Sequence, residues 1–169
     1  KTKTKDFFPY GSDERQFCSP GINLDIGVFM RTPYHEFKEY HTADDNLKFV
    51  SKTALKDSLS MLLKIISAIE ITKNIEQSSK IKKNNNTQSD IYLNLKPKCE
   101  PQLGKRKLYR NISKSRLIGK YNSEDLFEMS LLWILNYSDG NHSLKDISKI
   151  SGLPIKLLKH SSQLLLKKS

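Results

Sequence analysis

The chain has 169 residues, the size of one ordinary domain or two small ones, and it is too short for a complete two-lobed enzyme. Apolar residues make up 37% of it and charged residues 28%, which excludes wholesale disorder and a fibrous chain. No stretch approaches the roughly 18 consecutive apolar residues of a membrane span. Because residue 1 is Lys rather than Met, we expect the native N-terminus to lie upstream and the chain to be a fragment.

The two cysteines, Cys18 and Cys99, are far apart and form no CxxC pair. This disfavours a disulfide framework, a zinc ribbon and a thioredoxin-type site. A reducing, cytoplasmic location is therefore the simplest expectation.

The net charge of +11 would suit nucleic acid, but its distribution decides how to interpret it. Residues 76–120 carry 12 basic and 3 acidic groups, whereas residues 121–169 total only +1. Basic patches act chiefly when they are concentrated on one face. The pattern therefore favours solvated linker charge over a phosphate-binding surface.

In chain order, the first expected element is a strand. Residues 22–30 form an apolar run bounded by proline-containing turns, typical of a strand in a largely buried sheet. Residues 31–46 mix aromatic and acidic groups without a clear period and indicate an ordered loop. From Ser51, apolar residues recur at steps of four and three, which predicts a helix that Ser51 caps. The stripe consists of Leu55, Leu59, Leu62, Ile66 and Ile69.

The middle of the chain is polar. Residues 76–90 lack large apolar groups over most of their length and predict a linker or surface loop. Residues 91–95 alternate weakly and indicate a short strand. The segment that follows is too rich in Pro, Gly and Lys to form a regular helix.

The last fifty residues predict three short helices. Residues 126–135 are almost entirely apolar and indicate a buried helix that ends at a turn-forming cluster. Ser143 and Asp146 form a capping pattern for a second helix, which Gly152 ends. Pro154 is a favoured first-turn residue for the third helix. Two helices joined by a tight Gly-containing turn outline a helix-turn-helix.

Motifs for familiar chemistry are missing from the sequence. It contains no P-loop, dinucleotide fingerprint, HExxH or nucleophile elbow. What remains is a group of acids and imidazoles in the first 46 residues. On composition alone they are better interpreted as solvated surface side chains than as a metal site, because a metal site needs several ligands with matched geometry. The group comprises Asp13, Glu14, His35, Glu36, Glu39, His41, Asp44 and Asp45.

Long motifs carry a family resemblance. They are GSDERQFCSPG at residues 11–21, MRTPY at 30–34 and EYHTADDNL at 39–47, and they continue in residues 94–106 and 132–140. Together they resemble the C-terminal end of an aminopeptidase-like family in the co-catalytic zinc exopeptidase superfamily. Members of that family resemble α/β/α zinc aminopeptidases with an appended winged helix-turn-helix, and several are labelled polysaccharide-biosynthesis proteins.

The resemblance implies an α/β fold class with a division into three parts. Residues 1–75 would be the C-terminal portion of a three-layer α/β/α zinc-exopeptidase-like domain. Residues 76–120 would be a basic linker and connecting segment. Residues 121–169 would be a mostly helical winged helix-turn-helix domain, which lacks its wing because the chain stops at Ser169.

The resemblance also implies roles for individual residues. His41 matches the His of a His-Thr-x-x-Asp motif that supplies the last zinc ligand. Asp45 would support this loop, either by a hydrogen bond behind the ligand or by helping to start the next helix. Asp13 and Glu14 stand where relatives have a Ser-Asp-His element near the substrate pocket, although Glu14 departs from that pattern. His35 is better interpreted as a surface histidine than as a second ligand.

The activity implied is hydrolysis of a peptide-like amide with zinc as cofactor. All but one of the family's metal ligands lie upstream, and so the 169-residue piece alone is expected to bind zinc weakly and to be inactive. The alternative is a catalytically idle scaffold, or a regulator that binds DNA or protein through its winged helix.

The third predicted helix offers a different partner. Four of its polar residues would face outward and suit phosphates and base edges in type. Because residues 121–169 total only +1, docking to a protein or intramolecular packing is favoured over DNA binding. No membrane partner is expected. The four residues are Lys156, Lys159, His160 and Gln163.

Overall fold

The computed structural model describes residues 3–9, 13–33, 36–73, 90–108 and 123–168. By contacts the chain divides into two compact units. Unit 1 comprises Lys1–Val28 and Asn85–Ser169, and unit 2 comprises Phe29–Asn84. The domain boundaries expected after residues 75 and 120 stay predictions.

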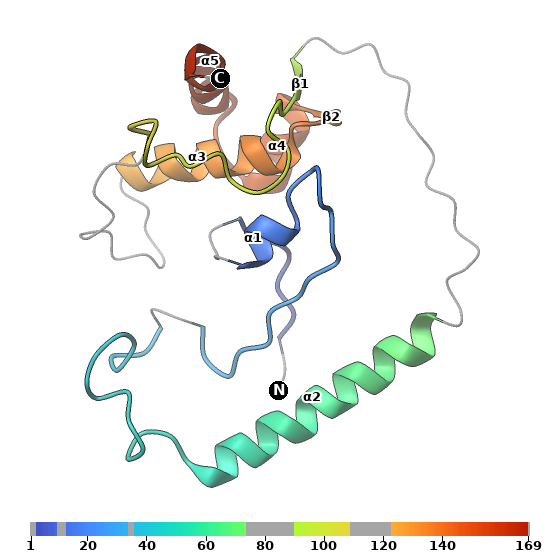
Figure 1. Ribbon diagram of the computed structural model, residues 1–169, viewed down its shortest axis with the longest axis vertical. Helices are drawn as coiled ribbons and strands as arrows, with labels where there is room; N and C mark the ends of the chain where they lie inside the picture. The colour runs from blue at the N-terminus through green and yellow to red at the C-terminus, as the bar shows by residue number, and fades with distance from the viewer. Residues whose placement is uncertain (1–2, 10–12, 34–35, 74–89, 109–122, 169) are drawn as a thin grey trace. The chain divides into compact units, whose positions relative to one another are not determined.

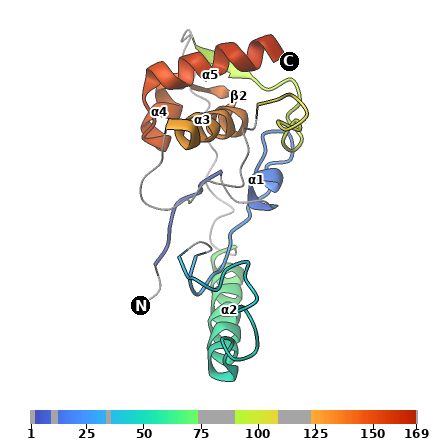
Figure 2. The ribbon, with the colours of Figure 1, turned by 90° about the vertical axis from the view of Figure 1, so that its left-hand side faces the viewer.

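Three helices form the centre of unit 1: α3 (Ser123–Tyr137), α4 (Leu144–Ser151) and α5 (Ile155–Lys168). Helix α5 packs on α3 (Figure 2). At this contact Ser130 and Ser161 are both fully buried, and their hydroxyl oxygens lie 2.6 Å apart. The buried apolar side chains are Leu103, Leu108, Met129, Leu131, Leu132, Trp133, Ile134, Leu144, Ile147, Leu153 and Leu158. The three predicted helices are confirmed.

A two-stranded antiparallel sheet lies beside these helices (Figure 1). Strand β1 (Ile91–Leu93) pairs with β2 (Asp139–Ser143), the segment that joins α3 to α4. The short strand predicted at residues 91–95 is thus confirmed for its first three residues. The second strand was not predicted, because its polar, glycine-containing sequence is typical of a turn.

Within unit 1, the N-terminal segment packs on helix α3. The rings of Phe7 and Phe8 meet Trp133 edge-on, with centroids 6.4 and 6.0 Å apart. A short helix, α1 (Asp13–Phe17), follows. Further on, the Gly21 N–H donates to the Pro97 carbonyl at 2.8 Å, and a Cβ at residue 21 would lie 2.9 Å from Pro97. Glycine is therefore required at this close approach.

The strand predicted at residues 22–30 was wrong. This segment has no regular secondary structure, and most of it is exposed; Leu24 and Val28, for example, are half-exposed. A strand needs a partner for its backbone hydrogen bonds, and within the described residues this segment pairs with none. The three-layer α/β/α arrangement stays a prediction.

Unit 2 is built around α2 (Lys52–Lys73), the long green helix of Figure 1. The Ala54 N–H donates to the Ser51 hydroxyl at 3.0 Å, which confirms the predicted cap. Arg31 donates to the Ala54 carbonyl at 3.1 Å and ties the preceding loop to the helix. The predicted apolar stripe, from Leu55 to Ile69, is between 41 and 58% exposed. Among the described residues, no helix is long and apolar enough to cross a membrane.

Candidate functional site

The predicted metal ligand, His41, lies on an exposed loop of unit 2. The Thr42 hydroxyl donates to the Glu39 carbonyl at 2.8 Å and accepts from the Asp44 N–H at 3.2 Å. The imidazole stacks on the ring of Tyr40, with centroids 4.2 Å apart. These local bonds hold His41 at the turn, where its ring is accessible to solvent.

His41 has a left-handed backbone conformation, with φ of 57°. This region is sparsely populated by residues other than glycine, although His, Asn and Asp enter it more often than most. Such conformations gather at functional sites. They also occur elsewhere among the described residues of this chain, for example at Asn23 and Gln102. The conformation is compatible with a site but does not identify one.

Asp45 is exposed, and its backbone N–H donates to the Thr42 carbonyl at 3.2 Å. Ser51, and not Asp45, caps the following helix. The described residues contain no group of three or more His, Cys, Asp or Glu side chains that could hold a metal ion. His35 lies outside the described residues. The described residues therefore do not make up a zinc site, and His41 would supply one ligand at most.

Asp13 and Glu14, the substrate-pocket candidates, open helix α1. Asp13 is exposed, and Glu14 is partly buried with its carbonyl accepting from the Cys18 N–H at 2.8 Å. They belong to unit 1, whereas His41 belongs to unit 2. Their assignment to a pocket stays a prediction.

The outward face of α5 presents the residues predicted for it. Lys156, Lys159, His160 and Gln163 are all exposed. The Lys159 ammonium pairs with the Asp90 carboxylate, just before β1, at 3.2 Å. One of the two lysines is thus partly neutralised within the chain, which weakens this face as a phosphate-binding surface.

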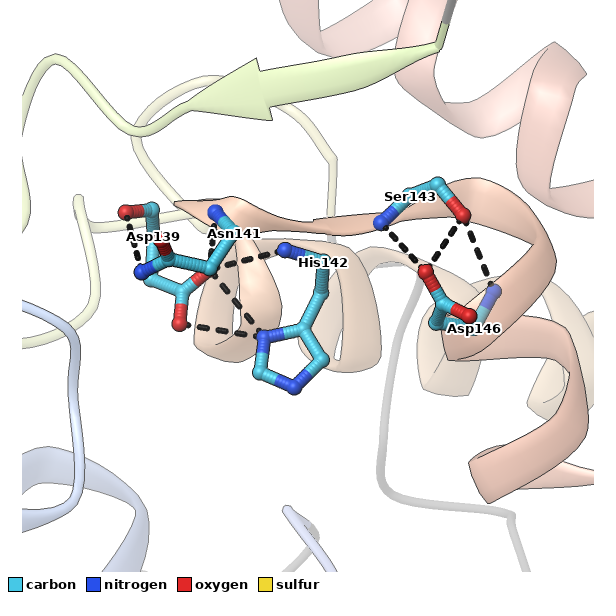
Figure 3. Close-up of polar contacts among 5 residues, drawn as sticks. All are labelled: Asp139, Asn141, His142, Ser143 and Asp146. Carbon is cyan, nitrogen blue, oxygen red and sulfur yellow. Dashed lines mark hydrogen bonds and ion pairs between the residues drawn. The ribbon is translucent and has the colours of Figure 1, made fainter. Parts of the chain in front are cut away.

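A tight polar turn begins at Asp139, in the segment that leads into α4, the first helix of the helix-turn-helix (Figure 3). The Asp139 carboxylate accepts from the backbone N–H of Asn141 at 2.8 Å and contacts the His142 ring nitrogen at 3.0 Å. Gly140 between them has φ of 81°, a conformation that glycine adopts without steric cost. Burial alone would raise the pKa of Asp139, but these hydrogen bonds outweigh it and hold the pKa below its ordinary value.

The predicted cap of α4 is a complete capping box (Figure 3). The Ser143 hydroxyl accepts from the Asp146 N–H, and the Asp146 carboxylate accepts from the Ser143 N–H at 3.0 Å and from its hydroxyl at 2.6 Å. The hydrogen bonds from Ser143 lower the pKa of Asp146. Gly152 ends the helix with φ of 72°. Helix α4 is therefore specified at both of its ends.

These elements define a winged helix-turn-helix domain: a model described as winged helix-turn-helix matches residues 90–169. The match begins at the residue before β1. A second model, described as a domain of unknown function (DUF4910), matches residues 1–72.

Among individual proteins, the chain is similar to one from Clostridium acetobutylicum named "Putative polysaccharide biosynthesis protein with aminopeptidase-like domain". The two are 45% identical over 160 residues, which are 95% of this chain and 31% of the relative. The chain thus spans about a third of the length of that relative. The chain is also similar to a crystal structure described as a "putative peptidase" from the same species, with 41% sequence identity. The match covers 97% of this chain and 30% of the chain in that structure, with a TM-score of 0.36.

Sequence reasoning missed several features of unit 1. The pairing of Lys159 with Asp90, the ion pair of Arg15 with Glu100 and the docking of Phe7 on Trp133 all join distant segments. A local sequence pattern cannot indicate a contact between segments that are distant in sequence. The turn at Asp139, in contrast, was predicted from the turn-forming cluster that contains residues 138–140.

Proposed function

We propose that this chain is the C-terminal part of a zinc-dependent aminopeptidase-like hydrolase that acts on peptide or amide bonds. The similarity to a relative named for its aminopeptidase-like domain carries this proposal. The chain corresponds to about a third of that relative, and the remaining two thirds would supply the other metal ligands.

His41 is the residue through which this chain would take part. Its ring is exposed on a loop that turns on local hydrogen bonds, and so it is available to a ligand cluster contributed by other sequence. Bound zinc ions would polarise a substrate carbonyl and lower the pKa of a bound water. The described residues would orient one imidazole, that of His41. The Tyr40 ring stacks against it and would restrict its rotation.

The isolated chain provides the first test. Because the described residues contain no cluster of three ligands, the 169-residue chain should lose zinc on dialysis and should not hydrolyse an aminoacyl amide. Metal content after dialysis and turnover of an aminoacyl p-nitroanilide measure this. Zinc retained at one equivalent, or turnover by the chain alone, would contradict the proposal that upstream sequence completes the site.

The winged helix-turn-helix supports a second role, that of a docking module. In unit 1 the N-terminal segment packs on this domain, through Phe7 against Trp133 and through the hydrogen bond from the Gly21 N–H to the Pro97 carbonyl. Intramolecular packing is therefore already one use of its surface. A catalytically idle scaffold with the same fold is the alternative if the longer protein proves inactive.

A further inference from the structure

A cavity of about 140 Å³ lies in unit 1, bounded by the end of β1, residues 101–108, α3 and α5. Leucine is the commonest residue type in its walls. These leucines range from Leu103, which is fully buried, to Leu95, which is 76% exposed, and so the cavity reaches from the core to the surface. Its volume approaches the ~150 Å³ of an engineered apolar cavity that binds benzene. A ring or a short alkyl chain would fit.

The charged groups around this cavity share one sign. Lys96, Arg106 and Lys168 line it, and none of its described lining residues is an Asp or a Glu. Arg106 donates to the Pro101 carbonyl, which holds its guanidinium at the wall. Lys96 and Lys168 are exposed. An apolar space bordered by cations of one sign favours a ligand with an apolar body and a negative head.

Two neutral polar groups of the cavity, the Asn94 amide and the Ser162 hydroxyl, are already engaged in hydrogen bonds. The Asn94 amide donates to the Leu135 carbonyl at 3.2 Å, and the Ser162 hydroxyl donates to the Lys159 carbonyl at 2.9 Å. A sugar or other polyhydroxy ligand would leave hydroxyl groups unpaired against leucine walls, which is costly. An uncharged hydrocarbon would gain nothing from the lysines.

We infer that this cavity binds a single-chain amphipathic anion. An alkyl tail of about eight carbons would occupy the leucine-lined space, comparable to a cavity that accepts benzene. A carboxylate or phosphate head would lie at Lys96 and Lys168. This site is separate from the His41 loop and does not depend on the hydrolase proposal.

Four small ligands test the inference on the full 169-residue chain: octanoate, octyl phosphate, octanol and acetate. Leucine methyl NMR shifts report binding, with Leu135 and Leu165 as the wall residues to follow. Octanoate, with about ten non-hydrogen atoms, should bind with a dissociation constant of about 1 mM. Octanol should bind about tenfold more weakly, and acetate should not bind. Whether octanoate or octyl phosphate binds more tightly identifies the head group.

Charge variants separate the contribution of the lysines to binding from that of the apolar walls. The double change Lys96→Gln with Lys168→Gln should weaken octanoate about tenfold, as expected for two exposed ion pairs, and leave octanol unchanged. The matched control is Lys98→Gln with Lys107→Gln, two exposed cations that do not line the cavity. Leu95→Asp, at an exposed wall position, should abolish octanoate binding.

Three results would overturn the inference. Octanoate that leaves the wall methyl signals unmoved would show that the cavity is not a ligand site. Equal affinities for octanoate and octanol, or an unchanged octanoate affinity in the lysine double variant, would show that the anionic head is not recognised.

Discussion

The Arg15 guanidinium and the Glu100 carboxylate form an ion pair, with Nη2 and Oε2 2.8 Å apart, that joins helix α1 to the segment after β1. Both side chains are mostly buried, at 15 and 11% exposure. The Glu100 N–H also donates to the Gln16 side-chain oxygen at 2.6 Å. Within unit 1 the N-terminal segment is thus anchored to the winged helix-turn-helix domain, and a substitution of either Arg15 or Glu100 would remove the ion pair.

Arg15→Ala should lower the free energy of unfolding of unit 1 by about 3 kcal/mol, because it removes the guanidinium that balances the charge of the mostly buried Glu100 carboxylate. Urea unfolding followed by the fluorescence of Trp133, the only tryptophan, measures this. The matched control is Arg31→Ala, which removes an arginine that bonds to α2 in unit 2. A Trp133 transition that moves equally in both variants would refute the anchoring role.

Ser143→Ala should destabilise unit 1 by about 1 kcal/mol, because the change removes the hydroxyl that satisfies a free N–H in the first turn of α4. Thermal unfolding followed by Trp133 fluorescence detects the loss. Ser67→Ala, at an exposed position of α2, is the control and should leave that transition unchanged. Identical midpoints for Ser143→Ala and the unmodified chain would mean that the capping box contributes no stability.

Unit 1 should lose stability in acid. The pKa values of Asp139 and Asp146 are lower in the folded chain than their ordinary value of 3.8. A carboxyl group with a lowered folded pKa stabilises the fold above its unfolded pKa, and this contribution disappears as the pH falls through the folded value. Asp139→Asn should therefore lower the stability of unit 1 at pH 7. It should also make the loss of stability below pH 3.8 less steep than in the unmodified chain. The melting temperature as a function of pH measures both effects, with exposed Asp57→Asn as control. If the melting temperature of Asp139→Asn falls with pH as steeply as that of the unmodified chain, the Asp139 carboxylate is not the source of the acid sensitivity.

The winged helix should not bind DNA through α5 at physiological salt. Lys159 is paired with Asp90, and the net charge of residues 121–169 is only +1, whereas affinity for DNA depends on phosphate neutralisation. We expect no gel shift at about 1 μM protein, a concentration at the tight end of non-specific DNA binding. A salt-dependent shift that Lys156→Gln with Lys159→Gln abolishes would reverse this preference.

The predictable features of this fold are those that neighbouring residues determine. Ser51, Ser143 and Gly152 act within one turn of their own helices, and each was recognisable from its position beside an apolar pattern. The strand expected at residues 22–30 fails for the opposite reason. An apolar run satisfies its backbone only with a second strand, and the described residues offer it none.

The candidate site, likewise, could be predicted from the sequence only where neighbouring residues determine it. The motif around His41 indicates a metal ligand by resemblance, and the structure gives its ring an exposed position. A coordination site, however, depends on residues distant in sequence, which a local motif cannot supply. The cavity near Leu95 could not be predicted either, because its walls come from four separate segments.

We propose that His41 is one ligand of a zinc site completed by sequence outside these 169 residues. The most direct test is the zinc content of the longer protein proposed above, purified and dialysed, with and without His41→Ala. His160→Ala, at an exposed histidine of α5, is the matched control. His41→Ala should lower bound zinc by at least about half, because it removes one ligand, and His160→Ala should leave it unchanged. Equal zinc content in all three proteins would contradict it.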